Sequence, residues 1–265
     1  MAEFKEKWQR QFGRQIQFFD EIKKAKGVLK FDRRYVIPSD ICSQFYCEQK
    51  LEQEYLTGKI ITDEMVQGVE GHAHIVEDFE LVSMEEAWRD MYTKEKTALA
   101  EFIFIAPYKE IFLIGRPDVI FFIGGNPILL FEFKFSKYDS DFLSRHAQAL
   151  CYGLIMREIG FDVKNLFYSI VVFKPEMLKE RKFIKNIPQK IISDFLSGTF
   201  GSLESNSKSY GDVKAYIHKF NGKEAEKNVD WSLEYWANKR EACCTEGIGK
   251  CHSCEYNQKC QKFSL

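Results

Sequence analysis

The sequence lacks long apolar runs and lacks an excess of charge of either sign. No stretch is apolar over the roughly 20 residues that a membrane-spanning helix needs, and the amino-terminal residues are polar and charged, so we expect neither a membrane anchor nor a signal peptide. The chain carries 38 Lys and Arg against 39 Asp and Glu, so any surface for nucleic acid must be a local patch. Internal repeats and low-complexity segments are also missing. We therefore predict a soluble, cytoplasmic protein of one sizeable domain or two small ones, with no membrane partner.

Cysteine, by contrast, is plentiful. Eight cysteines in a soluble intracellular chain indicate metal or redox chemistry rather than disulfides. Near the carboxyl end, Cys251, Cys254 and Cys260 follow the spacing C-x2-C-x5-C, which is typical of a zinc or iron–sulfur site. Three thiolates leave a four-coordinate set one ligand short. The fourth ligand could come from any of four residues: Cys243, Cys244, His252 or the distant Cys47.

A predicted β-hairpin occupies the middle of the chain. Two β-type apolar runs, VIFFI and PILLF, flank Gly124-Gly125-Asn126, whose composition suits a tight loop with positive φ angles. We take Gly125 as the centre of a three-residue loop, which pairs Ile123 with Pro127.

This register places charged side chains together. Asp118 lies directly opposite Glu132, and Lys134 falls on the same face because side chains alternate along a strand. A surface ion pair would explain such charges. The flanking residues are apolar, however, so both strands are expected to be covered on both faces. Buried carboxylates need a partner, and a divalent metal is the usual reason to hold two of them together.

Helices and strands are expected on both sides of this hairpin. Apolar spacing predicts helices at residues 3–26, 39–56, 62–81, 83–91, 140–160, 188–196 and 231–242, and strands at 101–107, 109–115, 165–173 and 213–220. Residues 202–211 read as a long, mobile loop. The first helix carries an apolar stripe expected to pack on the domain: Trp8, Phe12, Ile16 and Phe19.

Polar residues at fixed positions support three of these helices. Ser39, directly after Pro38, and Thr62 are each expected to cap a helix. Ser83 and Glu86 have the spacing of a capping box.

Two pairs of residues share helix faces through a spacing of four. The pairs are Gly68 with His72 and Gln148 with Tyr152. A lone histidine on a helix is usually structural, and the Gln–Tyr pair could equally be the polar edge of an amphipathic helix.

Taken together, the motifs resemble a nuclease family. In chain order they are Cys47-Glu-Gln-Lys, Gly68-x3-His72, Gly115-Arg-Pro-Asp118, Glu132-Phe-Lys134, Gln148-x3-Tyr152 and Cys251-x2-Cys254-x5-Cys260. This combination is similar to the RecB-type nucleases of the PD-(D/E)xK superfamily in their iron–sulfur form. It most resembles the CRISPR-associated exonucleases called the Cas-four family.

The resemblance implies an α/β (α+β) fold. Its restriction-endonuclease-like PD-(D/E)xK core is a mixed central sheet flanked by helices, with a helical, cysteine-rich iron–sulfur clasp. The expected organisation follows the chain: an N-terminal helix and extended lead-in (1–37), a helical segment with the first cluster cysteine and the ligand histidine (38–98), the nuclease core (99–220), and a C-terminal helix with the cysteine cluster (221–265).

The resemblance also implies roles for individual residues. His72, Asp118, Glu132 and the main-chain carbonyl of Phe133 would hold Mg²⁺ or Mn²⁺. Lys134 would orient the attacking water, and Gln148 and Tyr152 would position Lys134 and the DNA strand. A [4Fe–4S] cluster, with zinc as the alternative, would be held by Cys47, or Cys42 in its place, together with Cys251, Cys254 and Cys260.

The implied function is a metal-dependent DNA exonuclease that acts mainly on single-stranded ends. Within a CRISPR system it would trim spacer precursors together with the integrase proteins. Alternatives are a DNA-repair or a virus- or plasmid-borne RecB-like nuclease, or a DNA-binding module on the same fold that does not cleave.

Overall fold

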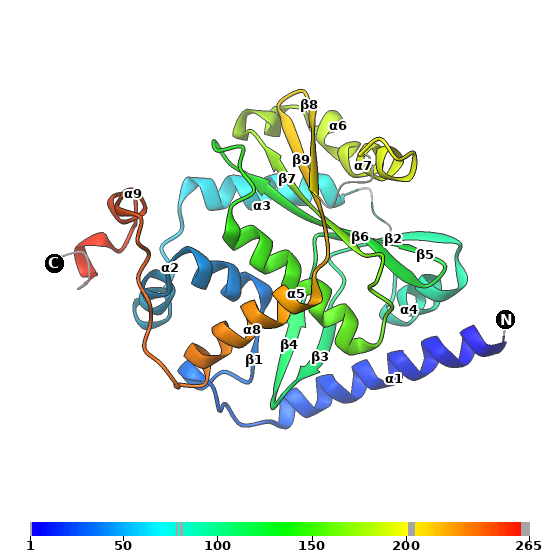
Figure 1. The fold of residues 1–265 in the computed structure, drawn as a ribbon, viewed down its shortest axis with the longest axis horizontal. Helices are drawn as coiled ribbons and strands as arrows, with labels where there is room; N and C mark the ends of the chain where they lie inside the picture. Colours follow the sequence, from blue (N-terminus) through cyan, green and yellow to red (C-terminus); the bar gives the residue numbers. More distant parts are fainter. Residues whose placement is uncertain (1, 78, 80–81, 201–204, 261–265) are drawn as a thin grey trace.

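A six-stranded mixed sheet forms the centre of the protein, and helices cover both of its faces (Figure 1). The structure is a computed structural model that describes residues 2–77, 79, 82–200 and 205–260. In spatial order the strands are β2 (Lys96–Ala100), β5 (Val119–Ile123), β6 (Asn126–Phe135), β7 (Phe167–Phe173), β9 (Val213–Lys219) and β8 (Ser205–Tyr210). β6 runs parallel to β7, and every other neighbouring pair in this sheet is antiparallel. The expected mixed sheet flanked by helices is therefore present.

A smaller sheet and the helices complete the described chain. The second sheet pairs β1 (Tyr35–Val36) with β4 (Ile111–Gly115) and β4 with β3 (Phe104–Tyr108). The helices are α1 (Ala2–Lys24), α2 (Pro38–Thr57), α3 (Asp63–Val76), α4 (Met84–Thr93), α5 (Leu143–Ile159), α6 (Arg181–Lys185), α7 (Ile187–Leu196), α8 (Gly222–Trp236) and α9 (Ile248–His252), with 3-10 turns at Lys30–Asp32, Pro175–Lys179 and Asn257–Lys259. Among the residues described, no helix has both the length and the apolar character needed to cross a bilayer.

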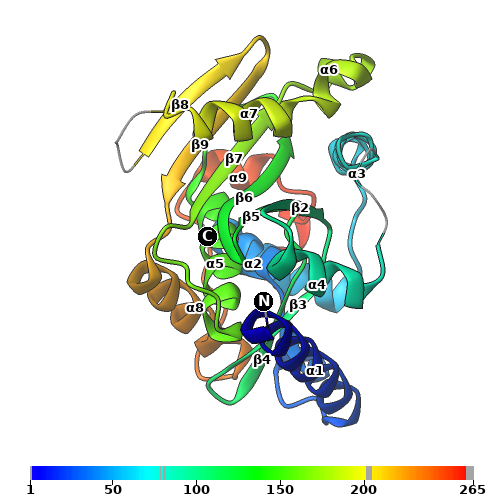
Figure 2. The same cartoon turned by 90° about the vertical axis from the view of Figure 1, so that its right-hand side faces the viewer.

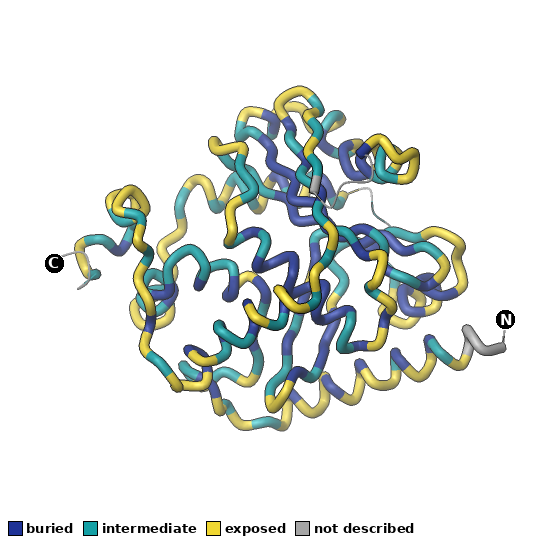
Figure 3. The backbone as a smooth tube through the Cα atoms, viewed as in Figure 1, coloured by how far each residue is buried: buried dark blue, intermediate teal, exposed yellow. Residues whose placement is uncertain are grey.

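Helices lie on both sides of the central sheet (Figure 2), and much of the sheet is buried (Figure 3). Each face of the sheet has its own hydrophobic core. On one face, Leu130 and Ile170 pack with residues of α5. On the other face, Phe131 and Val171 pack with residues of α3, α6 and α7. Because side chains alternate along a strand, Glu132 shares the face of Leu130 and points toward α5. The carboxylate of Glu132 therefore lies in the layer between the sheet and a helix.

The hairpin has the predicted register at Asp118 and Glu132, but its turn is shorter than predicted. The loop has two residues, Gly124 and Gly125, with φ of 55° and 82°, as a type I′ turn requires. Ile123 consequently pairs with Asn126, so the predicted three-residue loop is wrong. A β-bulge in the following strand adds the missing residue, and the next pairs are Phe121 with Leu129 and Val119 with Phe131. Asp118 and Glu132, which adjoin this last pair, are therefore opposite each other as predicted.

The stripe predicted for the first helix is only partly buried. Ile16 and Phe19 are 43% and 48% exposed. Trp8 of the predicted stripe is buried, and the other buried residues of this helix are Gln11, Gln15, Phe18 and Ile22. Gln15 donates to the carbonyl of Ile105 and accepts from its N–H, both at 2.8 Å. A polar residue thus covers the edge of β3, which an apolar pattern cannot reveal.

Several local predictions are also corrected. α2 begins at Pro38 after Ile37, and Ser39 does not cap it. Residues 205–210, predicted as mobile loop, form the edge strand β8, while 202–204 lie outside the described residues. The sequence pattern did not indicate β2. The helix predicted at 62–81 ends earlier, at Val76, and the helix predicted to begin at residue 231 begins nine residues earlier, at Gly222. By contrast, Thr62 caps α3, and Ser83 and Glu86 form the predicted capping box of α4.

Two glycines in the middle of α3 differ in what surrounds them. A Cβ atom added at Gly71 would lie 2.2 Å from the ring of Phe135, which is itself stacked on Phe173 at a centroid distance of 4.9 Å. A Cβ atom added at Gly68 would meet nothing within 4 Å. Gly71 therefore allows α3 to approach β6 closely, while Gly68 does not have that role.

We predict that alanine at these two positions changes stability in opposite directions. Gly71→Ala should lower the free energy of unfolding by about 1–3 kcal/mol through overpacking. Gly68→Ala should raise it by up to about 1 kcal/mol, because alanine favours a helix more than glycine does. Urea denaturation of the two variants measures both values, and shifts of the same sign would contradict the packing described here.

Candidate active site and cysteine cluster

The candidate site is built around Glu132 on β6. Its side chain is 3% exposed, and Oε1 lies 2.6 Å from Nζ of Lys134. The second oxygen, Oε2, is buried without a hydrogen-bond partner. A buried carboxylate oxygen with no partner is costly. The arrangement is therefore suited to a cation that would approach Oε2.

Asp118 connects this strand to α3. Its Oδ2 accepts a hydrogen bond from the backbone N–H of Phe133 at 2.5 Å. Its Oδ1 lies 2.7 Å from Nε2 of His72. The contact seen for Phe133 is thus made by its N–H, whereas the sequence-based expectation concerned its carbonyl.

A chain of hydrogen bonds continues from Lys134 into α5. Nζ of Lys134 donates to Oε1 of Gln148 at 3.2 Å. Nε2 of Gln148 donates to the hydroxyl of Tyr152 at 3.3 Å, and that hydroxyl donates to the carbonyl of Arg116 at 3.2 Å. Every residue predicted from the sequence for the active site therefore lies in one connected region, contributed by α3, β6, α5 and the lead-in to β5.

Burial and the charges of neighbouring side chains shift the pKa values of the ionisable residues at this site. Burial, followed by the charge of Asp118, raises the pKa of Glu132 to about 7, against the opposing effect of Lys134. Burial alone would lower the pKa of Lys134, but the charges of Glu132 and its neighbours raise it overall. The same balance holds for His72, where the hydrogen bond and charge of Asp118 outweigh burial and raise the pKa. Lys134 and His72 thus lie in contact with the carboxylates of the site.

Sequence reasoning missed one further carboxylate at this site. Oε1 of Glu101 lies 3.2 Å from Nδ1 of His72 and 3.8 Å from Arg116. Its backbone N–H donates to the carbonyl of Asp118 at 3.0 Å, and its φ of 50° is left-handed. Glu101 directly follows β2, the strand that the sequence pattern did not indicate, so no signal in the sequence marked it.

The side chains predicted as metal ligands at this site lie close together, but their donor atoms do not form one coordination sphere. Within the described chain, one group of three potential ligands has its donor atoms within 4.8 Å of one another, and it consists of Asp141, His146 and His218. At the candidate site His72 contacts Asp118, and Glu132 contacts Lys134. The donor set suits a divalent ion, and binding one requires these side chains to exchange partners.

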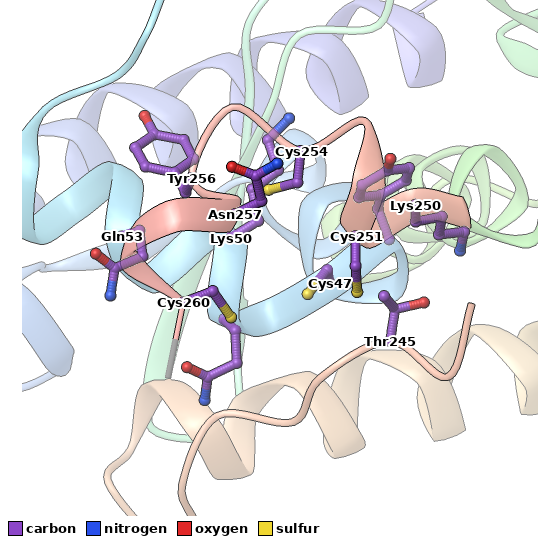
Figure 4. A pocket seen from close by; sticks show the side chains of 12 residues that line it. Cys47, Lys50, Gln53, Thr245, Lys250, Cys251, Cys254, Tyr256, Asn257 and Cys260 are labelled. Atoms are coloured by element: carbon purple, nitrogen blue, oxygen red, sulfur yellow. The ribbon is translucent and has the colours of Figure 1, made fainter. Parts of the chain in front are cut away.

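Four cysteines line a single cavity beside the second half of α2 (Figure 4). They are the four predicted as cluster ligands: Cys47, Cys251, Cys254 and Cys260. Cys42 lies elsewhere, where the charges of Lys134 and Glu132 act on its buried thiol. At Cys47 the backbone leaves helical geometry, with φ of −172° and ψ of 114°, so α2 is interrupted at this residue.

The sulfurs of the four cysteines do not lie close enough together for three of them to bind one ion without moving. No three cysteine sulfurs in the described chain lie within 4.8 Å of one another. Tetrahedral zinc, with Zn–S bonds of about 2.3 Å, would hold its sulfurs about 3.8 Å apart. Burial and the neighbouring thiols Cys47 and Cys260 raise the pKa of Cys251. A positively charged group would stabilise the thiolates.

The residue after Cys47 fixes the C-terminal segment through a buried charge. Glu48 is fully buried and binds Arg240 through both oxygens, at 2.5 and 2.7 Å. The backbone N–H of Cys243 donates to the same carboxylate at 2.8 Å. The pKa of Arg240 is raised by this hydrogen bond, although partial burial opposes the shift.

The next two residues continue these contacts. Nε2 of Gln49 donates to the carbonyl of Ala242 at 2.8 Å. Nζ of Lys50 lies 2.8 Å from Oε2 of Glu255. The tripeptide Glu48-Gln49-Lys50 therefore attaches the segment that carries the C-terminal cysteines to α2. We call it the α2 clamp.

Comparisons with known proteins add little. No family model matches the sequence, and no curated protein matches it. Among solved structures, the fold is similar to the crystal structure of SSO0001, with a TM-score of 0.43 and 9% identity over 96% of each chain. A similarity at this level carries no information about the chemistry of the site.

We predict that Arg240→Ala destabilises the protein by about 3–5 kcal/mol, because it leaves the buried carboxylate of Glu48 without a cation. The matched control is Lys137→Ala, whose exposed side chain lies 3.9 Å from the equally exposed Glu64; its effect should stay below about 1 kcal/mol. Chemical denaturation of both variants measures the difference. Equal effects would mean that the α2 clamp does not stabilise the fold.

Proposed function

We propose that the protein is a metal-dependent deoxyribonuclease of the RecB type that removes nucleotides from single-stranded DNA ends. The observation that carries the proposal is the placement of Asp118, Glu132 and Lys134 on one face of buried strands, with Oε2 of Glu132 free. On this proposal the central sheet is a PD-(D/E)xK core. The proposal places no weight on the weak structural similarity.

The resemblance to RecB-type nucleases supplies the ligands of the proposed ion. His72, Asp118, Glu132 and the carbonyl of Phe133 would hold Mg²⁺ or Mn²⁺, and the imidazole shifts the preference toward Mn²⁺. When bound, the ion supplies a water of lowered pKa and polarises the phosphoryl oxygen.

The side chains around the ion position the reacting groups. Lys134, held between Glu132 and Gln148, would orient the attacking water and stabilise the charge that develops on the phosphate. Tyr152 keeps Gln148 in place through the hydrogen bond between them. Its own pKa is raised well above the ordinary value by burial, so the hydroxyl stays neutral and keeps its proton for the carbonyl of Arg116.

The biological setting that we propose is the trimming of new spacer precursors alongside the CRISPR integrase proteins. A repair nuclease or a virus- or plasmid-borne nuclease would use the same site. The genes that neighbour this one distinguish these settings, because an adjacent integrase gene and repeat array are expected only in the first.

We predict that Glu132→Gln and Lys134→Ala each reduce Mn²⁺-dependent DNA degradation by at least about 100-fold, as expected when one charged group of a catalytic site is lost. Single- and double-stranded DNA, labelled at the 5′ or the 3′ end, gives the rate and the polarity. Glu85→Gln and Lys164→Ala, both exposed and outside the site, are the matched controls.

Two outcomes would count against the nuclease. Equal degradation by the wild type and both site variants would identify a contaminating enzyme. Wild-type protein that binds the labelled strands without shortening them would favour the non-cleaving DNA-binding module.

We further propose that Cys47, Cys251, Cys254 and Cys260 hold a [4Fe–4S] cluster of structural function. Cys47→Ala should bleach a brown, anaerobically purified protein and lower its melting temperature. Cys42→Ala and Cys243→Ala should keep the colour, because these thiols lie outside the cavity lining. The absorption spectrum and the iron content measure the effect. A colourless, zinc-containing protein that Cys47→Ala leaves unchanged would refute the cluster.

A further inference from the structure

Three side chains from separate segments meet on the side of α5 that faces β9. Asp141 precedes α5, His146 lies in its first turn, and His218 is on β9. Nε2 of His146 and Nε2 of His218 lie 3.1 and 3.0 Å from the same oxygen of Asp141. All three side chains are partly buried. Their donor atoms lie within 4.8 Å of one another, the one such group in the described chain.

The orientation of the rings matches that of metal-binding histidines. Nδ1 of His146 is hydrogen-bonded to the hydroxyl of Tyr168 at 2.9 Å. A histidine that binds a metal through one ring nitrogen usually makes such a bond with the other, which fixes its orientation. The ring of Tyr168 is also stacked on that of His218, with centroids 5.4 Å apart. Tyr168 therefore supports both imidazoles, and their Nε2 atoms are left pointing at Asp141.

The spacing of the donor atoms is close to that of a zinc site. Zinc with bonds of about 2.0–2.1 Å to nitrogen and oxygen holds tetrahedral ligands about 3.3–3.4 Å apart. The two nitrogen–oxygen distances fall within a few tenths of an ångström of that value.

Solvent can reach the group from one side. His146, Tyr168 and His218 line a surface hollow of about 910 Å³, together with Phe220 and Asn221. Three protein ligands with an open side leave a coordination position for water. Two imidazoles and one carboxylate are the protein ligands of a known class of zinc sites.

We propose that Asp141, His146 and His218 bind one Zn²⁺ ion that fastens the start of α5 to β9. The same helix carries Gln148 and Tyr152, so this attachment would also hold the helix that faces Glu132. The zinc site does not depend on the proposed nuclease function, because its evidence and its test involve other residues and no DNA.

The test is equilibrium dialysis of the full chain, kept anaerobic, against buffered free Zn²⁺, with bound metal counted by mass spectrometry. His146→Gln and His218→Gln should each bind one zinc fewer than the wild type. His74→Gln, at a partly buried histidine on α3, is the matched control and should bind as many as the wild type. Titration with Co²⁺ separates this site from the thiols, since the band lost in the variants should lack sulfur-to-cobalt charge transfer.

A second variant keeps the proposal testable if the glutamine variants do not fold. Tyr168→Phe retains all three ligands and removes only the partner of Nδ1, so zinc affinity should fall by about 10–100-fold. The proposal would be overturned if Tyr168→Phe, Asp141→Asn and the glutamine variants that fold all kept the zinc content and zinc affinity of the wild type.

Discussion

The burial of a carboxylate between the central sheet and α5 is the constraint on which the arrangement of the candidate site depends. Glu132 cannot stay there without counter-charges, and Lys134 two residues along the strand supplies the nearest one. Lys134 needs its own acceptor, which α5 provides through Gln148. The position of α5 against the sheet is therefore tied to a polar requirement as well as to the apolar core around it. α3 is bound to the same group through His72 and Asp118.

A similar dependence operates in the second half of α2, where polar contacts attach the C-terminal segment. Glu48 is fully buried because Arg240 and a backbone N–H from the C-terminal segment satisfy both of its oxygens. The interruption of α2 at Cys47 comes directly before Glu48. Because Cys42 lies on the preceding helical turns beside Lys134, α2 spans the distance between the cysteine cavity and the candidate active site.

Much of the candidate site could be predicted from the sequence, because a period of two along apolar strands determines which residues share a face. The grouping of Asp118, Glu132 and Lys134 followed from this rule. Glu101 could not be found in this way, since its place depends on the pairing of β2 with β5. The grouping of Asp141, His146 and His218 was not predicted for a related reason. The start of a helix and a strand distant in the sequence come together only in the folded chain. The stripe of α1 was misassigned because Gln15 pairs with a strand edge, and β8 was missed because its residues are polar.

The compensation between the turn and the bulge in the β5–β6 hairpin has a consequence for how this segment can change in evolution. Removing the one extra residue of the bulge, or adding one to the turn, reverses the parity of every later position in β6. Glu132 and Lys134 would then face α3, and Phe131 and Phe133 would face α5. Insertions or deletions of two residues preserve the parity. Homologous chains should therefore differ in the length of this hairpin by an even number of residues. A change of one residue in the turn should be accompanied by a change of one residue in the bulge.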